Sequence, residues 1–275
     1  MDRNEIRSWL KDRPGLLQAI ELQGPNGRAG ERKRKKLKEV AGFSEVILRY
    51  VQKWQAEREP LRVLECSCGK SYLGLVLKLL VEDALDKDVR LTGNDVDEEL
   101  VEKCRQVAAE VGVEDAEYVP ARTLDVAEGR EFDLVISLHA CDTATDEAIA
   151  RGIQLKVPLI LAVPCCQNQI RGQIKGDKSL EGITEFGPAR YRMANLLTDS
   201  LRAQFLRGAG YEVKMDEITS PRVTPKNLCI CARRIRNPSG GRRDRRYREL
   251  RDFFGVKPAV EKFCPGVIED AEVDG

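Results

Sequence analysis

The sequence predicts an α/β fold in which a mostly parallel, seven-stranded sheet carries helices on both faces. Three observations support this prediction. From Leu61 to Val163, short apolar segments alternate with longer amphipathic ones, the pattern typical of β-α-β units. Residues 1–60 show helical periodicity alone. Two last apolar segments, within residues 211–233, are joined by a short loop with two prolines, which predicts an antiparallel pair at one end of the sheet.

The individual elements follow from apolar spacing and from the residues that break it. An amphipathic helix is expected around Leu37, Val40, Ile47 and Val51. The sequence Gly-Pro-Asn-Gly at residues 24–27, which breaks helices, separates it from an earlier helix around Ile6–Leu22. Asn168 to Pro188 shows little periodicity. Strands are expected at Leu61–Glu65, Val89–Asn94, Ala116–Val119, Phe132–Leu138, Leu159–Val163, Tyr211–Thr219 and Asn227–Arg233. Helices are expected at Tyr72–Leu85, Glu98–Val111, Thr145–Gly152 and Met193–Phe205.

Composition restricts the class of protein. The 275 residues are 42% hydrophobic, enough for a full core. Apolar runs fall far short of the ~20 residues that cross a membrane, and the N-terminal residues lack the apolar stretch of a secretory signal. Nine cysteines, an odd number with adjacent pairs, suit a reducing compartment. We therefore expect a cytoplasmic protein without membrane association.

Charge is distributed unevenly along the chain. Lys and Arg number 46 against 45 Asp and Glu, yet residues 28–38 and 233–251 are strongly basic and the end is acidic. Three parts are expected: a helical extension at residues 1–60, an α/β domain at 61–236, and a basic then acidic tail at 237–275. The two basic segments favour RNA binding, with a solvated charged face as the alternative.

The first expected strand runs into a tight turn rich in small residues. It is not a phosphate-binding P-loop, because the first glycine of that motif would stand at Leu64. Small residues instead let a ligand lie against the turn, where backbone N–H groups face its carboxylate. The cofactor-binding residues expected here are Glu65, Ser67, Cys68, Gly69, Lys70 and Tyr72.

An acid at the tip of the second strand is a candidate for ribose recognition. Asp95 stands there, followed by Val96, and a carboxylate can accept hydrogen bonds from two ribose hydroxyls. Asp97 precedes a helical segment and is expected to be its N-cap, a role that remains the alternative for Asp95. Since residues 121–123 contain no acid, backbone groups near Thr123 and Leu124 are expected to hold an adenine.

Two further boxes are the most distinctive parts of the sequence. Residues 139–146 read His-Ala-Cys-Asp-Thr-Ala-Thr-Asp, and residues 164–166 read Pro-Cys-Cys. With the turn after Glu65 and Thr-Pro-Lys-Asn at 224–227, they resemble a family of class I S-adenosylmethionine (SAM) methyltransferases over about residues 32–235. That family includes bacterial proteins and the eukaryotic rRNA adenine dimethylase domain-containing and related methyltransferase-like proteins. The tRNA 2′-O-methyltransferases that act on the acceptor stem are more distantly similar.

The resemblance implies a Rossmann-like fold, SAM as cofactor, and methyl transfer to a nitrogen or hydroxyl of a macromolecule, expected to be rRNA or tRNA. From their positions, His139 and Asp142 are expected to position the acceptor or remove its proton, with His139 also bordering the cofactor. The alternatives are that His139 only organises the turn after its strand and that Asp142 caps a helix. Such proteins usually carry glycine where this chain has Ser67 and Ser71. The alternatives are a non-catalytic RNA-binding protein with a degenerate methyltransferase fold, and a protein methyltransferase.

Five cysteines are expected at strand ends on one edge of the sheet: Cys66, Cys68, Cys141, Cys165 and Cys166. We expect them to be small apolar fillers without a metal, because no Cys-x-x-Cys pair exists and the spacing is irregular. A nucleophilic cysteine is an alternative, because RNA cytosine-C5 methyltransferases place cysteines after the corresponding strands. Cys229 and Cys231, in the last strand, are expected to be structural and to face opposite sides of the sheet.

Overall fold

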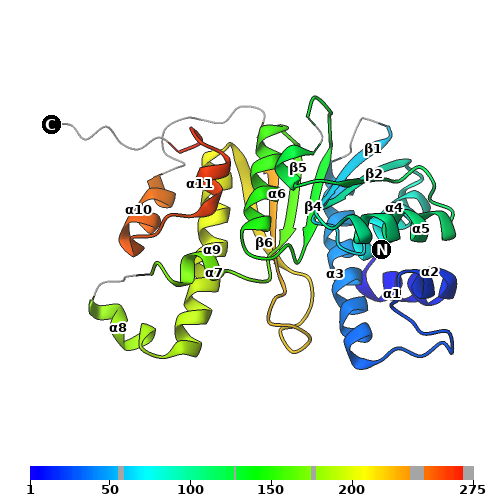
Figure 1. Ribbon diagram of the computed structural model, residues 1–275, viewed down its shortest axis with the longest axis horizontal. Coiled ribbons are helices and arrows are strands. Elements are labelled where there is room, and N and C mark those ends of the chain that lie inside the picture. The colour runs from blue at the N-terminus through cyan, green and yellow to red at the C-terminus, as the bar shows by residue number, and fades with distance from the viewer. Residues whose placement is uncertain (55–58, 127, 175–177, 236–244, 269–275) are drawn as a thin grey trace.

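The computed structural model describes residues 1–54, 59–126, 128–174, 178–235 and 245–268. Its centre is a seven-stranded sheet with the strand order β3-β2-β1-β4-β5-β7-β6 (Figure 1). All pairings are parallel except those of β7, which runs antiparallel to β5 and β6. The expected sheet and its antiparallel end are thus confirmed. The strands are β1 (Leu61–Cys66), β2 (Val89–Asp95), β3 (Glu117–Pro120), β4 (Leu134–Leu138), β5 (Leu159–Val163), β6 (Tyr211–Glu217) and β7 (Leu228–Arg234).

Helices cover both faces of the sheet, and each face has its own apolar cluster (Figure 1). One face carries α1 (Arg3–Lys11), α2 (Pro14–Ala19), α3 (Glu31–Trp54), α4 (Tyr72–Leu85) and α5 (Glu98–Glu110). The other carries α6 (Thr143–Gln154), α7 (Asn168–Arg171), α9 (Gly187–Gly208), α10 (Arg245–Phe254) and α11 (Ala259–Phe263). Helix α8 (Lys178–Thr184) packs against α9. None of the helices within the described residues combines the length and apolar character needed to cross a membrane.

The alternation of apolar side chains explains this layering. In β4, Leu134 and Ile136 belong to the cluster under α3 and α4, whereas Val135 belongs to the cluster under α6 and α9. A strand that is buried on both faces needs apolar residues at consecutive positions, as β4 and β5 have. Cys229 and Cys231 lie on the same face, with their sulfurs 3.4 Å apart. This corrects the expectation of opposite faces, because residues two apart on a strand share a face.

The N-terminal segment is part of the same packed structure. Ile6 and Leu10 are fully buried in the cluster that includes β1 and α4. The single helix expected around Ile6–Leu22 is two helices, because Pro14 cannot continue α1 and instead begins α2. Between residues 168 and 188, where little periodicity was expected, α7 and α8 form.

The C-terminal residues differ most from expectation. Residues 245–268 include α10 and α11, which pack against α9 and α6 instead of extending away as a tail. Tyr247 is 0% exposed, and its ring lies edge-on to Phe205, with centroids 5.5 Å apart. Residues 236–244 and 269–275 of the expected tail lie outside the described residues. The core of the domain therefore extends beyond residue 236.

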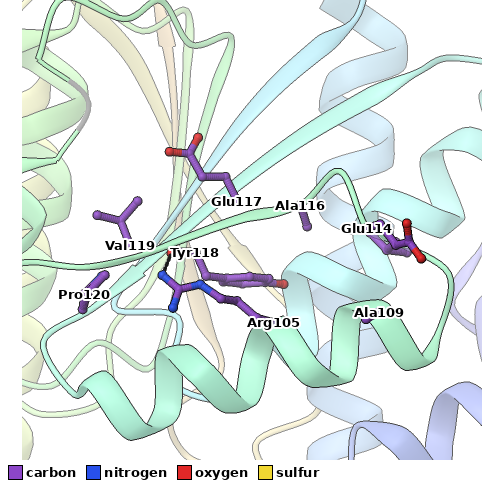
Figure 2. A pocket seen from close by; sticks show the side chains of 9 residues that line it. Arg105, Ala109, Glu114, Ala116, Glu117, Tyr118, Val119 and Pro120 are labelled. Carbon is purple, nitrogen blue, oxygen red and sulfur yellow. Dashed lines mark hydrogen bonds between the residues drawn. The ribbon is translucent and has the colours of Figure 1, made fainter.

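A hollow at the outer edge of the sheet lies between α5 and β3 (Figure 2). The guanidinium of Arg105 reaches across it and donates to the carbonyl oxygen of Tyr118 at 2.6 Å. This contact satisfies one backbone acceptor of an edge strand, a group that would otherwise invite another chain to pair with it. None of the residues expected at the cofactor or catalytic site lines this hollow.

Burial of Tyr247 predicts that the C-terminal helices stabilise the whole domain. Tyr247→Ala removes a fully buried ring and should lower the free energy of unfolding by about 3–5 kcal/mol. Arg246→Ala, at the neighbouring exposed position of α10, should change it by less than about 0.5 kcal/mol. Urea unfolding followed by circular dichroism measures both. Equal, small effects would mean that α10 is a dispensable appendage.

Candidate active site

The carboxyl ends of β1, β2, β4 and β5 meet at one edge of the sheet, where open parallel sheets bind their ligands. Glu65 pairs in register with Gly93 of β2 and Ile136 of β4, so the expected site residues of three strands lie close together. The N-terminal half of α3 and the loop between β6 and β7 project beyond the same edge (Figure 1). We call this region the carboxyl edge.

The turn after β1 is held in an unusual backbone conformation. Ser67, Gly69 and Ser71 have φ angles of 51°, 53° and 46°. The two serines thus adopt the left-handed region that costs a residue other than glycine about 1 kcal/mol. A side chain built on Gly69 would meet nothing within 4 Å, so the space above the turn is open. The backbone N–H of Gly69 donates to Asp95 Oδ2 at 2.9 Å and joins the turn to the tip of β2.

Glu65 supports this turn from beneath. Its side chain accepts hydrogen bonds from Ser71 Oγ and from the backbone N–H of Gly74, and the residue is 3% exposed. Tyr118 in turn donates its hydroxyl proton to Ser71 at 3.0 Å. Any side chain at position 74 would place its Cβ 2.3 Å from Glu65 Oε2, which explains the glycine. Burial raises the pKa of Glu65 to about 7, although the bonds from Ser71 and Gly74 oppose that rise. In this structure Glu65 shapes the turn.

The tip of β2 offers groups suited to a nucleoside. Asp95 is half-buried and accepts from the backbone N–H groups of Gly69 and Asp97, at 2.9 and 3.2 Å, which leaves part of its carboxylate capacity unused. Val96 beside it is 69% exposed. Asp97 accepts from the N–H groups at 99 and 100, which confirms it as the N-cap of α5.

Asn94 was not among the expected site residues, because it reads as part of the strand interior. Its Nδ2 donates to Thr123 Oγ1 and to the carbonyl oxygen of Ala121, both at 3.1 Å, and so fixes the 3-10 helix η1 (Thr123–Asp125). Its Oδ1 is buried without a partner among the described residues. This orphaned acceptor, the open turn, Asp95, Val96 and the half-buried Leu124 together fit a nucleoside cofactor.

The N-terminal helices reach this turn. Glu21, just after α2, forms ion pairs with both Lys70 of the turn and Lys103 of α5. Hydrogen bonds from Lys103 and Lys70 lower the pKa of Glu21 to about 2. Lys70 is therefore engaged by the extension, while Cys68 and Tyr72 are half-buried at the base of the turn.

His139 follows β4 and is paired with an acid from the N-terminal extension. Its Nε2 lies 3.0 Å from Oε2 of Glu39, a buried residue of α3, and Lys36 Nζ lies 3.6 Å from the same oxygen. Burial disfavours the charged carboxylate, but the hydrogen bond from His139 and the charge of Lys36 outweigh it and lower the pKa of Glu39. His139 Nδ1 is buried and has no hydrogen-bond partner within the described ranges. In the sequence, Glu39 is noticeable only as an acid beside the apolar positions of α3, and nothing else there indicates a role in the site.

Asp142 has a different environment. Its Oδ1 accepts from the backbone N–H of Gln169 at 3.0 Å, at the start of α7, and its φ angle is 52°. It makes no side-chain cap bond to α6. The structure describes no hydrogen bond between Asp142 and His139 in the parts of the chain it covers, so the two expected catalytic residues are near in sequence but separately held.

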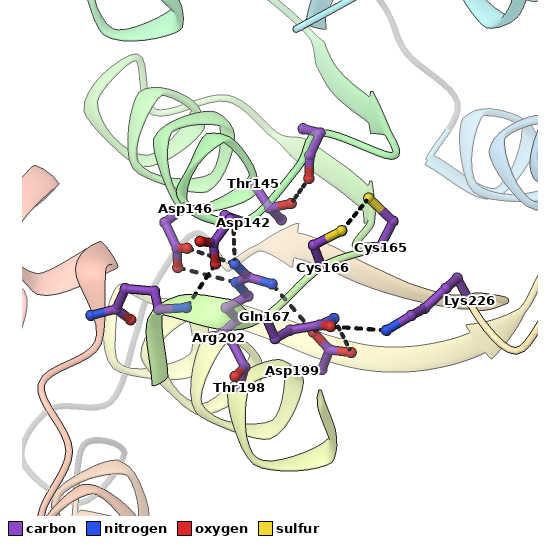
Figure 3. A network of polar contacts seen from close by, with 12 residues as sticks. Asp142, Thr145, Asp146, Cys165, Cys166, Gln167, Thr198, Asp199, Arg202 and Lys226 are labelled. Carbon is purple, nitrogen blue, oxygen red and sulfur yellow. Dashed lines mark hydrogen bonds and ion pairs between the residues drawn. The ribbon is translucent and has the colours of Figure 1, made fainter. Parts of the chain in front are cut away.

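A buried arginine organises the surroundings of Asp142 (Figure 3). Arg202 of α9 is 1% exposed and donates to both carboxylate oxygens of Asp146 in α6, at 3.1 and 2.6 Å. It also donates to Asp199, at 3.3 Å, and to the carbonyl oxygen of Asp142, at 2.8 Å. Gln167, after β5, bridges Asp199 and Lys226 of the β6–β7 loop. Sequence reasoning missed this network, because its members are far apart in the chain.

The cysteines after β4 and β5 form a compact group. The Sγ atoms of Cys141 and Cys165 are 3.4 Å apart, those of Cys165 and Cys166 are 3.6 Å apart, and those of Cys166 and Cys141 are 3.9 Å apart. Burial raises the pKa of the Cys141 and Cys165 thiols, which keeps the free thiols protonated at neutral pH and disfavours a nucleophilic cysteine. Cys66 is fully buried and fills space in the core.

The two basic segments occupy different places. Arg32, Arg34 and Lys35 are exposed on the part of α3 that projects beyond the carboxyl edge (Figure 1). Arg234, by contrast, donates its backbone N–H to the carbonyl oxygen of Pro158, at the amino end of β5, on the opposite edge of the sheet. Arg233 there pairs with Glu212.

Because the folded-state pKa of Glu65 lies above its unfolded value, its ionisation should weaken the fold. The folded state binds the proton more tightly, so stability falls as pH rises from about 4.5 to about 7, by on the order of 3 kcal/mol. Glu65→Gln keeps an acceptor for Ser71 and Gly74 but cannot ionise. Its stability relative to the parent should therefore grow across this pH interval, as urea unfolding at several pH values measures. A difference that stays constant with pH would contradict burial of an ionisable Glu65.

Comparisons with known proteins give a family match and a set of similar solved structures. Residues 35–173, about half of the chain, match the model of a family described as a methyltransferase domain. Curated protein sequences gave no significant match. Among solved structures, the chain is similar to magnesium protoporphyrin IX methyltransferase from Synechocystis with bound SAH, at 17% identity and a TM-score of 0.48, covering 84% of this chain and 100% of that one. It is also similar to an rRNA methylase from Streptococcus thermophilus, at 12% identity and a TM-score of 0.41, covering 65% of this chain and 89% of that one.

Structural likeness at this level says nothing about the substrate. Three observations agree with a methyltransferase domain: the family match, the sheet order with its antiparallel last pair, and the site after β1 and β2 that fits a nucleoside. The chain therefore belongs to the family described as a methyltransferase domain.

Proposed function

We propose that this methyltransferase acts on RNA, either rRNA or tRNA, and transfers the methyl group of SAM to a nitrogen or hydroxyl. The observation that carries this proposal is the gathering of basic side chains around the carboxyl edge. The turn after β1, residues 67–71, which we call the cofactor turn, and His139 lie at the same edge. A protein side chain as acceptor is the alternative, and the experiments below distinguish the two.

The cofactor site follows from the residues at the tips of β1 and β2. Bound SAM supplies an electrophilic methyl group on a sulfonium. Asp95 would accept hydrogen bonds from the ribose hydroxyls, and Val96 and Leu124 would border the adenine ring. The open turn at Gly69 would receive the amino-acid part, with Ser67, Cys68, Lys70 and Tyr72 as its neighbours. Glu65 keeps the turn in shape.

Proton handling is assigned to the pair formed by Glu39 and His139. The ionised Glu39 accepts the Nε2 proton of His139, and this tautomer leaves Nδ1 as a basic nitrogen. Nδ1 is covered in this structure, so the proposal requires the side chains around the end of β4 to shift when the acceptor binds. The acceptor group then supplies the partner that Nδ1 lacks, and Nδ1 takes its proton. Asp142, half-exposed beside the neighbouring loop, is proposed to contact the acceptor with the oxygen that does not cap α7.

Basic residues surround this edge from several elements. Arg32, Arg34 and Lys35 come from α3, and Arg171, Arg190, Arg192, Arg222 and Lys226 come from α7, α9 and the β6–β7 loop. Among them lies Tyr191, whose ring has Lys226 Nζ at 4.8 Å and Arg171 at 6.0 Å from its centroid. Both cations lie over the ring and so gather positive charge at this surface, which favours a phosphate-bearing partner such as a nucleic acid. The expected second basic segment contributes less, since Arg233 and Arg234 lie on the opposite edge.

If His139 takes the proton of the acceptor, its loss should slow the chemical step. His139→Ala should lower kcat by ~10²–10⁴-fold while the Kd for SAM stays within about twofold. Glu39→Gln, which keeps an acceptor but removes the charge, should have an intermediate effect. The measurement is transfer of radiolabelled methyl groups to RNA from cells that lack the gene.

Glu45→Gln is the matched control, because Glu45 lies on the same helix but pairs with Arg3. It should leave kcat unchanged. Unaltered kcat in both His139→Ala and Glu39→Gln would remove this pair from the mechanism. Label that enters protein instead of RNA would favour the alternative acceptor.

The basic residues of α3 should determine how strongly RNA binding depends on salt. Arg32→Ala with Arg34→Ala should lower the slope of log affinity against log salt by about 0.7–0.9 for each phosphate that the variant no longer neutralises. Fluorescence anisotropy with a labelled structured RNA measures the slope. Arg233→Ala with Arg234→Ala, a pair of exposed arginines on the opposite edge of the sheet, should leave it nearly unchanged. Equal slopes for both double variants would mean that the carboxyl edge is not the RNA-binding surface.

A further inference from the structure

The three sulfurs after β4 and β5 have the spacing of a metal-binding group. Their separations of 3.4, 3.6 and 3.9 Å bracket the value of about 3.8 Å that a tetrahedral zinc with bonds of ~2.3 Å imposes on its sulfur ligands. They form the one group of at least three such ligands found within the described residues. Irregular spacing along the sequence was the reason to expect no metal, but two adjacent strand ends bring these ligands together in space.

Rigid elements hold the three cysteines in place. Cys141 follows β4 by three residues and Cys165 follows β5 by two, and these strands pair in register from Leu134 to Leu138. The backbone N–H of His139 donates to the carbonyl oxygen of Val163 at 2.9 Å and extends this pairing beyond β4. On the far side, Arg202 holds the carbonyl of Asp142. The thiols therefore sit on a preformed scaffold.

We propose that Cys141, Cys165 and Cys166 bind one zinc-type divalent cation through three thiolates, with a fourth position open toward the carboxyl edge. Binding releases three thiol protons to solvent and changes no oxidation state. Thiolate donors select zinc over magnesium or calcium, which prefer oxygen. Cys141 is exposed, so the fourth position is accessible to water or to a group of the substrate. The site is independent of whether RNA is the acceptor.

Three thiolates around a dication leave one net negative charge, at an edge where Cys141 is exposed and Cys165 and Cys166 are half-buried. By contrast, Cys229 and Cys231 offer only two sulfurs in the apolar core, at 0% and 1% exposure, where a metal would leave its remaining positions unfilled.

The experiment uses the full chain, purified without a histidine tag under reducing conditions and in the presence of zinc. Elemental analysis should find about one zinc per chain in the parent protein, and replacement by cobalt should give the intense visible bands of a tetrahedral thiolate complex. Cys141→Ser, Cys165→Ser and Cys166→Ser should each lower the zinc content at least tenfold in protein that circular dichroism shows to be folded. Cys264→Ser, a cysteine outside the group, should retain it.

Three results would overturn the proposal. The first is a parent protein that takes up no zinc or cobalt after reconstitution. The second is zinc that persists in all three serine variants, or that Cys264→Ser loses equally. The third is mass spectrometry of the reduced preparation that finds a disulfide within the group in place of the metal. A serine variant that does not fold is replaced by the alanine variant at exposed Cys141.

Discussion

The positions of the loops at the carboxyl edge depend on the hydrogen bonds and ion pairs of the buried Arg202 guanidinium. Moving a charge out of water costs several kcal/mol, so Arg202 requires both oxygens of Asp146 and a further contact with Asp199. Those contacts fix α9 against α6 at one relative position. The same guanidinium holds the carbonyl of Asp142, a residue with positive φ, and thereby sets where the chain turns after β4. The loop carrying Cys141 and the Pro-Cys-Cys segment are built on this arrangement.

The N-terminal extension completes the site from the opposite face of the sheet. Glu39 supplies the carboxylate that orients His139, and Glu21 joins the cofactor turn to α5 through Lys70 and Lys103. Both acids come from segments that precede β1. The extension therefore contributes contacts to the carboxyl edge, and its helix α3 presents exposed arginines there.

The sequence predicted the elements whose evidence is local. Alternating apolar segments located all seven strands, and the position of Asp97 before α5 identified its cap, because both depend on neighbouring residues. The pairing of Glu39 with His139 joins residues 100 positions apart and had no local signal. The contacts of Arg202 with α6, and the grouping of Cys141 with Cys165 and Cys166, also join distant parts of the chain and had no local signal. Tyr247 sits in a charged segment that reads as a tail, yet it is buried because tertiary packing overrides composition.

The most direct test of this account is the affinity of two variants for SAM, measured by calorimetry. Asp95 and Asp97 are neighbouring acids, but only Asp95 bonds to the turn, whereas Asp97 caps α5. Asp95→Ala should weaken SAM binding by about 1.5–3 kcal/mol, the value of a charged hydrogen-bond acceptor. Asp97→Ala should keep the parent affinity and lose about 1 kcal/mol of folding stability instead. Equal SAM affinity in both variants, or a loss confined to Asp97→Ala, would contradict a cofactor site at the end of β2.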